Sequence, residues 1–331
     1  MSSKKKTTVG FTVVNNLPKC AIIGAGTMGT HIAFSLALGG AEVCVWDRPE
    51  ADLEDSAKRA EQAFDFVVEQ GLAKAEDKNT VLGRMSYTHD MKEAAAPAGF
   101  IIEAVLEDLG IKQAILKQAE EYCSDEAILS STTSALSSTA IQAALKKPGR
   151  FCIAHYAQPA YLVKLVEVVP GEQTDEAVTA AVTKLLNDTD KTPVLCPDIP
   201  GFLWARIQHA VLREFVSLVD RGLVSPEACD TILKQGYACR LPAMGAFEHA
   251  DLAGLDLMNG DAAKAVWADL YNVNDPAETS VGKLFAEGHT GMRSGQGFYN
   301  WKERNPDQFK RDRDAEIVRR VKIMAGAKVE F

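Results

Sequence analysis

A histidine and a glutamate interrupt two apolar, strand-like stretches of this sequence. His155 lies near the end of FCIAHY (151–156), and Glu167 lies inside LVEVV (165–169). If the two stretches are neighbouring strands, both side chains reach the edge where open α/β sheets bind ligands. A carboxylate fixes the tautomer of a neighbouring imidazole and stabilises its protonated form, so the pair is suited to taking a hydroxyl proton near neutral pH. The spacing alone equally allows a structural histidine and a glutamate on a solvated face.

A glycine-rich motif, GAGTMG (24–29), predicts a nucleotide-binding turn. It follows one strand-like stretch, opens an Ala-rich helical stretch, and precedes a second strand-like stretch that ends in Asp47. In this context Gly24 permits the tight turn, Gly26 lets the backbone approach a pyrophosphate at the helix N-terminus, and Gly29 allows close packing of helix on strand. A glycine-rich turn without function and a flavin-binding version of the motif are the alternatives.

Asp47 determines which nucleotide the motif is expected to bind. Its carboxylate is suited to accept hydrogen bonds from the adenosine ribose hydroxyls and would repel a 2′-phosphate, which favours NAD over NADP. Arg48 beside it weakens that preference, since an arginine can bind such a phosphate. The residues expected to bind NAD in this region are Gly24, Gly26, Thr27, Met28, Gly29 and Asp47.

Strand-like and helical stretches alternate between Lys19 and Pro197, whereas helical patterns dominate from Leu203 onward. The alternation predicts an α/β fold, in which a Rossmann-type doubly wound, mainly parallel sheet is followed by an all-α C-terminal domain. The strands are expected at 20–24, 42–47, 85–89, 100–105, 127–133, 151–156, 165–169 and 192–196. The expected division is a disordered tail at 1–17, an NAD-binding domain at 18–198, a helical domain at 199–303 and a helical extension at 304–331.

The composition excludes several classes of protein. The chain has 331 residues, of which 47% are hydrophobic and 24% charged, as is typical of a globular protein with a sizeable core. Its net charge of −9 argues against a nucleic acid partner. No apolar run is long enough to cross a membrane, the N-terminal stretch lacks the apolar core of a secretory signal, and the seven cysteines are scattered. We therefore expect a cytoplasmic protein that binds no metal.

Six motifs extend in order from about Lys19 to Trp301: IIGAGTMG, EAVLEDLGIK, STTSAL, AHYAQPAYLVKLVEVVPG, DIPGFLWARIQ and SGQGFYNW. Together they resemble the landmarks of the 3-hydroxyacyl-CoA dehydrogenase family. The resemblance implies NAD-dependent oxidation of an L-3-hydroxy acid, or of its CoA thioester, to the 3-keto product. It implies that His155 is the general base, that Glu167 orients it, and that Ser134 touches both the substrate oxygen and the cofactor. A plain helix N-cap is the alternative for Ser134.

The resemblance also implies further contacts with the cofactor. Glu107 and Lys112 match family residues beside the nicotinamide half. Gln158 replaces an asparagine that is usual in the family, and Arg293 stands where a lysine usually faces the cofactor. Helix-end charges without a role are the alternative for Glu107, Lys112 and Arg293. The helical domain is expected to build the substrate cleft and a homodimer interface, as in the family.

Three departures from the family pattern bear on the substrate. Ala205 stands where an active-site asparagine is usual, and the longer Gln158 is expected to replace that asparagine in part. Residues 51–80 form an arm that is lysine-rich and helps to hold CoA in the family, but here they contain eight acids and four bases, which should repel phosphates. Arg240 has a counterpart in the branch that resembles lambda-crystallin, or L-gulonate 3-dehydrogenase, and is suited to bind a carboxylate. A structural salt bridge is its alternative.

These departures favour a small free carboxylate over a long acyl-CoA as the small-molecule substrate. One alternative is a short-chain L-3-hydroxyacyl-CoA (3-hydroxybutyryl-CoA) dehydrogenase of fatty-acid metabolism. Another is a non-catalytic NADH-binding protein, like the lens crystallin recruited from this family. The 3-hydroxyisobutyrate and 6-phosphogluconate dehydrogenase group is disfavoured, since the first helix of the second domain, GFLWARIQHAVLREF, lacks that group's catalytic lysine.

Overall fold

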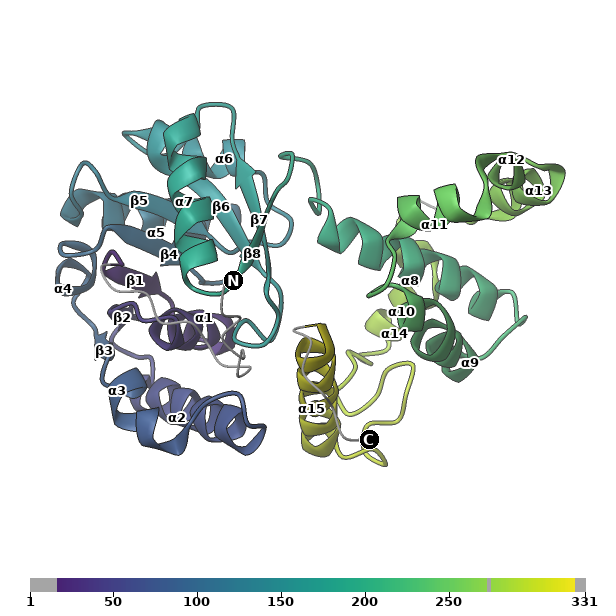
Figure 1. Ribbon diagram of the computed structural model, residues 1–331, viewed down its shortest axis with the longest axis horizontal. Helices are drawn as coiled ribbons and strands as arrows, with labels where there is room; N and C mark the ends of the chain where they lie inside the picture. The colour runs from purple at the N-terminus through teal and green to yellow at the C-terminus, as the bar shows by residue number, and fades with distance from the viewer. Residues whose placement is uncertain (1–16, 273–274, 325–331) are drawn as a thin grey trace, which may run out of the picture. The chain divides into compact units, whose positions relative to one another are not determined.

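The structure of the protein is a computed structural model that describes residues 17–272 and 275–324. The disordered tail expected at 1–17 lies outside the described residues, apart from Leu17. Within the described ranges the chain folds into two compact units (Figure 1).

The first unit contains the described residues up to Arg206 and those from Asp314 onward, and the second unit contains Ile207–Arg313. The boundary falls a few residues beyond 198, where the NAD-binding domain was expected to end. Helix α8 (Trp204–Asp220) is tied to the first unit at its start, because the backbone N–H of Trp204 donates a hydrogen bond to the side chain of Glu167, on a strand of that unit.

A single eight-stranded sheet forms the centre of the first unit (Figure 1). Its strands are β1 (Cys20–Ile23), β2 (Val43–Trp46), β3 (Met85–Thr88), β4 (Phe100–Glu103), β5 (Ile128–Ser131), β6 (Phe151–Tyr156), β7 (Leu165–Pro170) and β8 (Thr192–Leu195). The strand order is β3-β2-β1-β4-β5-β6-β7-β8, and every neighbouring pair is parallel except β6 and β7. The prediction of a Rossmann-type, mainly parallel sheet is confirmed, and all eight strands lie where the apolar stretches placed them.

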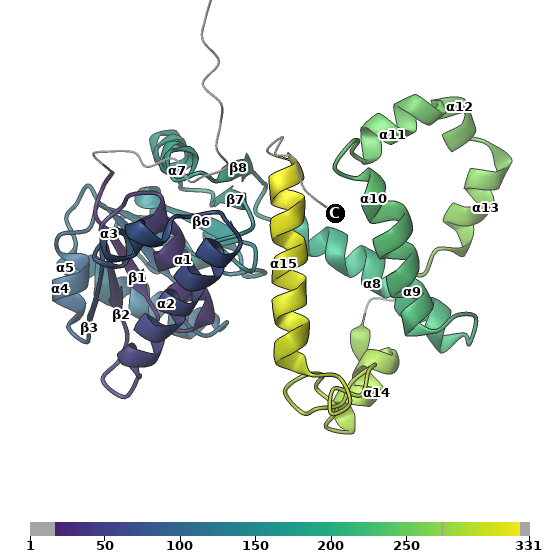
Figure 2. The ribbon, with the colours of Figure 1, turned by 60° about the horizontal axis from the view of Figure 1, so that its bottom comes forward.

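Helices cover both faces of this sheet (Figures 1 and 2). They are α1 (Thr27–Leu38), α2 (Leu53–Glu69), α3 (Lys78–Leu82), α4 (Met91–Ala95), α5 (Leu109–Tyr122), α6 (Ser138–Gln142) and α7 (Glu176–Asp188). Successive side chains of a strand point to opposite faces. In β1, Cys20 and Ile22 therefore pack into a core with α1, α2 and α7. Ala21 and Ile23 pack into a second core with α4, α5 and α6.

The second unit is helical, as the sequence predicted. Its elements are α8, α9 (Pro226–Ile232), a π-helical turn (Leu233–Tyr237), α10 (Ala238–Arg240), α11 (Ala246–Ala253), α12 (Leu255–Met258), α13 (Asp261–Asp269) and α14 (Ser280–Ala286). Among the described residues of this unit the β-structure is confined to isolated bridges within 291–300. The buried hydrophobic residues that the structure describes here are Val216 and Cys229. This unit therefore buries little apolar surface of its own.

A long C-terminal helix, α15 (Pro306–Met324), forms most of the extension (Figure 2). Val318 is buried in the core that also contains α2. Lys322 Nζ donates a hydrogen bond to the carbonyl oxygen of Gln70, at the end of α2. The C-terminal part of α15 thus packs against the arm at 51–80.

No helix in the described part of the chain has the length and apolar character needed to span a membrane. The described residues also contain no group of three or more histidine, cysteine or acidic side chains arranged to hold a metal ion. All seven cysteines are unpaired thiols.

Candidate active site

His155 on β6 and Glu167 on β7 lie directly opposite each other in the antiparallel pair. Their Nδ1 and Oε2 atoms are 2.7 Å apart, and the two side chains are 6% and 2% exposed. The structure thus brings the expected pair together, and the alternative of a solvated glutamate is wrong. Because a carboxylate only accepts hydrogen bonds, Nδ1 carries the ring proton and Nε2 is left as the basic nitrogen.

Ser134 lies on the other side of the imidazole, in the turn that follows β5. Its Oγ atom is 3.0 Å from Nε2 of His155. The next helix, α6, is capped by Ser137, whose hydroxyl accepts a hydrogen bond from the backbone N–H of Ala140. The N-cap alternative for Ser134 is therefore wrong. A hydroxyl and a basic nitrogen instead meet at the carboxyl edge of the parallel strands.

Glu167 is held by more than the histidine. Its Oε1 atom accepts hydrogen bonds from the backbone N–H groups of Leu203 and Trp204 at 2.8 and 2.9 Å, and lies 3.4 Å from the Cys196 thiol. Burial is the largest single influence and raises the pKa of this carboxyl, but its four hydrogen bonds together outweigh burial. The pKa of Glu167 is therefore lowered from its ordinary value. The carboxylate stays negative and can stabilise a histidine cation.

Phe202 covers the imidazole from the turn before α8. It is fully buried, and its ring centroid lies 5.7 Å from that of His155. Its φ of 45° falls in the left-handed region, which non-glycine residues rarely adopt, so the surrounding packing must hold its backbone there. The sequence carries no signal for this role, because an aromatic residue in an apolar turn is ordinary.

Glu107 and Lys112 belong to a charge cluster beside Ser134. Lys112 is 1% exposed, and its Nζ atom lies 2.8 Å from Glu103 Oε1 and 3.3 Å from Glu107 Oε2. Glu107 Oε1 accepts hydrogen bonds from the Thr133 hydroxyl and, at 3.1 Å, from the Ser134 N–H. Burial raises the pKa of Glu107, but these hydrogen bonds and the Lys112 charge together lower it from the ordinary value. The alternative of a helix-end surface charge is wrong for Lys112.

Glu103 was not foreseen, although the sequence carries a signal for it. It ends β4, FIIE, as the one charged residue of an otherwise apolar and buried strand. The same signal, a charge inside an apolar stretch, identified His155 and Glu167. A search for every such interruption would have found Glu103 as well.

The glycine motif forms the turn between β1 and α1. A Cβ atom at Gly29 would lie 1.8 Å from the carbonyl oxygen of Gly24, so the helix and the turn touch only because this residue is glycine. Gly24 itself has a φ of 117°, which L side chains rarely adopt. At Gly26, by contrast, nothing lies within 4 Å of a Cβ position. The backbone there is open to a ligand.

A cavity of about 650 Å³ opens beside this turn. Its lining includes Gly24, Gly26, Trp46, Asp47, Arg48 and Ile111. The α1 helix has neither a side-chain cap nor an acid in its first turn, so the N–H groups of Thr27 and Met28 suit a bound anion. Asp47 accepts hydrogen bonds from the Ala25 N–H at 2.7 Å and the Arg48 N–H at 2.8 Å, which fixes its carboxylate at the cavity wall. These residues fit a dinucleotide.

Two family models match almost the whole described chain. Residues 19–199 match the NAD-binding domain of 3-hydroxyacyl-CoA dehydrogenase, and residues 201–301 match its C-terminal domain. The chain belongs to the 3-hydroxyacyl-CoA dehydrogenase family. It is an NAD-dependent oxidoreductase that acts on a CH–OH group.

Proteins with different named substrates are similar to the chain. A 5-formyl-3-hydroxy-2-methylpyridine 4-carboxylate 5-dehydrogenase of Mesorhizobium japonicum is 30% identical over 307 residues, which cover 92% of this chain and 98% of the relative. A probable 3-hydroxybutyryl-CoA dehydrogenase of Deinococcus radiodurans is 33% identical over 283 residues, 86% of this chain and 100% of the relative. A similar solved structure is the crystal structure of a 5-formyl-3-hydroxy-2-methylpyridine 4-carboxylic acid 5-dehydrogenase, described as an NAD⁺-dependent dismutase. It matches with a TM-score of 0.86 at 29% identity, and the match covers 94% of this chain and 100% of that chain.

Gln158 and Ala205, two positions at which the sequence differs from the usual 3-hydroxyacyl-CoA dehydrogenase pattern, lie in the first unit. Gln158 is exposed in the loop that joins β6 to β7, three residues beyond His155. Ala205 is the second residue of α8 and follows directly on Trp204, which binds Glu167. Both thus lie within three residues of a residue that forms or holds the dyad.

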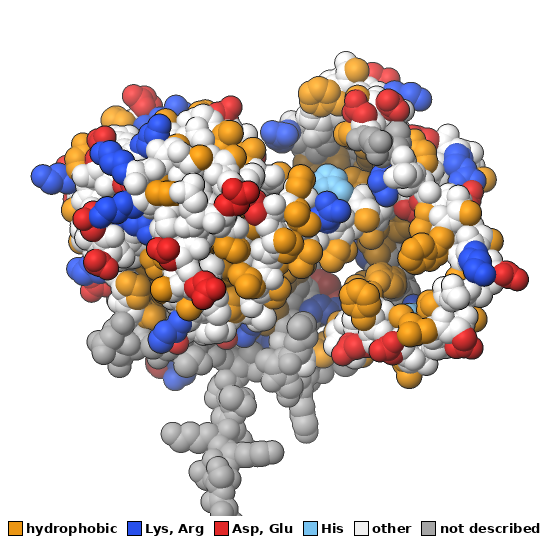
Figure 3. Space-filling model, turned by 90° about the horizontal axis from the view of Figure 1, so that it is seen from above, with side chains coloured by type: hydrophobic (Ala, Val, Ile, Leu, Met, Phe, Trp, Pro, Cys, Tyr) orange, Lys and Arg blue, Asp and Glu red, His pale blue; other side chains and the backbone are white. Residues whose placement is uncertain are grey.

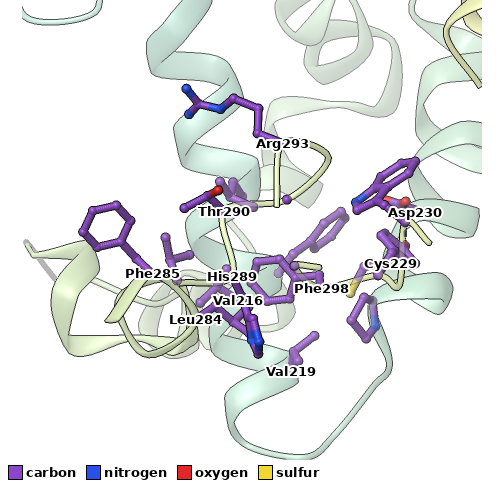
Figure 4. Close-up of a pocket in the computed structure, with 18 residues that line it drawn as sticks. Val216, Val219, Cys229, Asp230, Leu284, Phe285, His289, Thr290, Arg293 and Phe298 are labelled. Carbon is purple, nitrogen blue, oxygen red and sulfur yellow. Dashed lines mark hydrogen bonds between the residues drawn. The ribbon is translucent and has the colours of Figure 1, made fainter. Parts of the chain in front are cut away.

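Arg240 and Arg293 lie in the helical unit of the dehydrogenase. Arg240 ends α10 and is exposed, and its Nη1 atom is 3.3 Å from His249 Nε2. Arg293 lines a cavity of about 540 Å³ within this unit, where its side chain points away from the apolar residues (Figure 4). Their roles toward the substrate and the cofactor stay predictions.

Proposed function

We propose that this dehydrogenase oxidises the hydroxyl group of a small free carboxylate, an L-3-hydroxy acid. The observation that carries the proposal is the series Ser134, His155 and Glu167 at the carboxyl edge of the sheet, with separations of 3.0 and 2.7 Å. This series supplies a hydroxyl to hold the substrate oxygen, a base to take its proton and a carboxylate to balance the charge that results.

His155 takes the proton of the substrate hydroxyl at Nε2, the nitrogen that faces Ser134. The Ser134 hydroxyl donates a hydrogen bond to the substrate oxygen as negative charge develops on it. Glu167 stabilises the imidazolium that forms. Bound NAD supplies the acceptor for the hydride that leaves the carbinol carbon. The N-terminus of α1, the open backbone at Gly26 and the Asp47 carboxylate are the groups of this chain that would hold the dinucleotide.

The charge of the arm at 51–80 supports a substrate without CoA. The segment has eight acids and four bases. Three of the bases pair with acids of the same segment: Lys78 with Glu61 and Asp65, Arg59 with Asp55, and Lys74 with Glu76. An arm with surplus negative charge, and with three of its four bases already paired, repels the phosphates of CoA.

The C-terminal helix packs on this arm. The family model ends at residue 301, and α15 lies beyond it and binds the carbonyl of Gln70 at the end of the arm. The solved structure of the pyridine carboxylate dehydrogenase matches with a TM-score of 0.86, whereas that of (S)-3-hydroxybutyryl-CoA dehydrogenase from Ralstonia eutropha matches with 0.69, which supports a free acid as the substrate.

Arg240 is the group we assign to the substrate carboxylate, in keeping with the resemblance to the lambda-crystallin and L-gulonate 3-dehydrogenase branch. A guanidinium can bind a carboxylate through two parallel hydrogen bonds. The second candidate function is 3-hydroxybutyryl-CoA dehydrogenation, which the D. radiodurans relative favours. A crystallin-like role without catalysis is disfavoured by the intact hydrogen bonds among Ser134, His155 and Glu167.

Substrate preference tests the proposal. The purified protein is assayed with NAD and with NADP on free 3-hydroxy acids, L-gulonate among them, and with NADH on acetoacetyl-CoA. We expect kcat/KM to be highest for a free acid with NAD. Arg240→Ala should raise the KM for that acid about tenfold to a hundredfold, because a charged hydrogen-bond partner is lost. Arg221→Ala, an exposed arginine of the same unit that pairs with Asp269, is the matched control. Preference for the thioester, unchanged in Arg240→Ala, would contradict the proposal.

We also propose that the dehydrogenase is a homodimer in which the helical unit contacts a second copy. Apolar side chains lie on the surface of this unit (Figure 3). Among them, Phe247 is 90% exposed and Trp267 is 76% exposed. Patches of this kind mark protein interfaces. Sedimentation equilibrium should show a dimer for the wild type and a monomer for Trp267→Glu. Tyr122→Glu, in the first unit, should leave the dimer intact, and a monomeric wild type would contradict the proposal.

A cytoplasmic location completes the proposed function. All seven cysteines are free thiols, a state that a reducing compartment preserves. Fractionation of the source cells should recover the dehydrogenase in the cytosolic fraction, and its recovery from a secreted fraction would overturn this assignment.

A further inference from the structure

Glu103 is buried at the carboxyl end of β4 with both carboxylate oxygens engaged. Its side chain is 0% exposed. Oε1 accepts hydrogen bonds from Lys112 Nζ at 2.8 Å and from the Val105 N–H at 2.6 Å, and Oε2 accepts one from the Ser131 hydroxyl at 2.6 Å. Burial of a charge is unfavourable unless it is paired, and an apolar residue would suit this position better if nothing depended on the charge.

Hydrogen bonds and ion pairs lead from Glu103 to the dyad without a break. Lys112 Nζ bridges Glu103 and Glu107. Glu107 accepts a hydrogen bond from the Ser134 N–H at 3.1 Å, and Ser134 Oγ lies 3.0 Å from His155 Nε2. The series crosses the carboxyl edge of the sheet from β4 past β5 to β6.

We propose that Glu103 is a positioning residue that acts through Lys112 and Glu107 to hold Ser134 against His155. Its effect on the reaction rests on the proposed function. Two carboxylates share one ammonium group, so Glu103 holds Lys112 at β4 and leaves Glu107 free to fix the Ser134 backbone. Without the Glu103 charge, the buried ammonium group has Glu107 as its remaining acidic partner in the cluster and draws that carboxylate away from Ser134.

Loss of stability cannot by itself distinguish positioning from a structural role, because breaking any buried ion pair destabilises a protein. The chain offers a matched control at the other end of α5. Glu120 is buried there, 3.1 Å from Arg150, which directly precedes β6. This pair lies at the opposite edge of the sheet from the dyad. Glu120→Gln removes a buried charge of the same kind without touching the series that leads to His155.

Three variants separate the two roles: Glu103→Gln, Glu120→Gln and the double variant Glu103→Gln with Lys112→Met. We expect both single variants to lower the thermal unfolding midpoint. Of these two, only Glu103→Gln should lower kcat per folded molecule, by about tenfold to a hundredfold. The KM of the hydroxy acid should change little, because Glu103 positions a reacting group without touching the substrate. The double variant should regain stability, because no fully buried charge is left unpaired and Glu107 is 45% exposed, but it should not regain kcat.

A spectroscopic measurement makes the test independent of the substrate. The ¹⁵N chemical shift of His155 Nε2 reports its hydrogen bond to Ser134 and is assigned by its loss in His155→Gln. We expect Glu103→Gln and the double variant to shift this resonance, and Glu120→Gln to leave it unchanged. If the wild type turns over no hydroxy acid while Glu103→Gln still shifts the resonance, the proposed function fails and the positioning role stands.

Two outcomes would overturn the positioning role. The first is a Glu103→Gln protein with reduced stability but wild-type kcat and an unchanged His155 resonance. The second is a double variant in which stability and kcat recover together. If Glu103→Gln does not fold, the double variant, which carries no unpaired buried charge, decides between the two roles.

Discussion

The carboxylate of Glu167 accepts a 2.9 Å hydrogen bond from the backbone N–H of Trp204, the first residue of α8. The group that orients His155 is therefore also the anion at the N-terminus of the helix that continues into the second unit. A carboxylate in this position is favoured by the helix dipole and by the N–H groups that the first turn leaves unpaired. Glu167 thus stays ionised despite its burial, as its lowered pKa indicates.

Replacement of Glu167 by glutamine should reduce kcat about a hundredfold or more, with the affinity for NAD unchanged. The amide group offers its NH₂ or its carbonyl to Nδ1, and the imidazole loses the negative charge that stabilises its protonated form. Steady-state kinetics and NAD titration measure the two effects. Glu172→Gln, an exposed acid just after β7, is the control. Wild-type turnover in Glu167→Gln would show that the dyad is not catalytic.

The lowered pKa of Glu167 also predicts how stability changes in acid. Since the folded-state pKa lies below the ordinary 4.5, ionised Glu167 stabilises the folded state above about pH 4.5. That stability is lost as the pH falls through the lowered pKa. The difference in thermal unfolding midpoint between the wild type and Glu167→Gln should therefore shrink as the pH falls from 6 to about 3.5. A constant difference would contradict the shift.

Lys191 predicts a second gain of stability with rising pH, in the alkaline range. Its Nζ donates to the carbonyl oxygens of Ala160 and Val163, and burial lowers its pKa from 10.5 to about 7. Between these values the unfolded chain holds a proton that the folded protein lacks, so the folded state gains stability as the pH rises. Urea unfolding between pH 7 and about 10 should show that the free energy of unfolding of the wild type rises relative to that of Lys191→Met. Lys184→Met, on the exposed face of α7, should give no such change.

Gly26 and Gly29 should respond differently to alanine. Gly26→Ala has open space for its methyl group, so it should fold with an unchanged unfolding midpoint but bind NAD at least about tenfold more weakly, because the methyl group blocks the pyrophosphate. Gly29→Ala places its Cβ against the Gly24 carbonyl and should lose stability as well. Calorimetry and NAD titration on both variants check this. Equal loss of stability would mean that Gly26 is a packing residue too.

Much of this protein follows from local sequence patterns. The eight strands were predicted from short apolar stretches, because a buried parallel strand needs an unbroken apolar run. The turn at 24–29 followed from glycine spacing, which determines how closely the backbone can approach itself. The dyad was found because a charge inside an apolar stretch, such as Glu167 in LVEVV, needs a partner.

Only the tertiary structure decided which distant groups meet. The register of the β6 and β7 pair places His155 opposite Glu167, and a shift of one residue would have pointed one of them to the other face. Glu103 is bound by side chains from α5 and β5, and Glu167 by backbone N–H groups of the turn before α8 and of its first residue. Such contacts depend on how elements pack, which periodicity along the chain does not encode. The hydrogen-bonded route from Glu103 to His155 is therefore a property of the folded sheet edge.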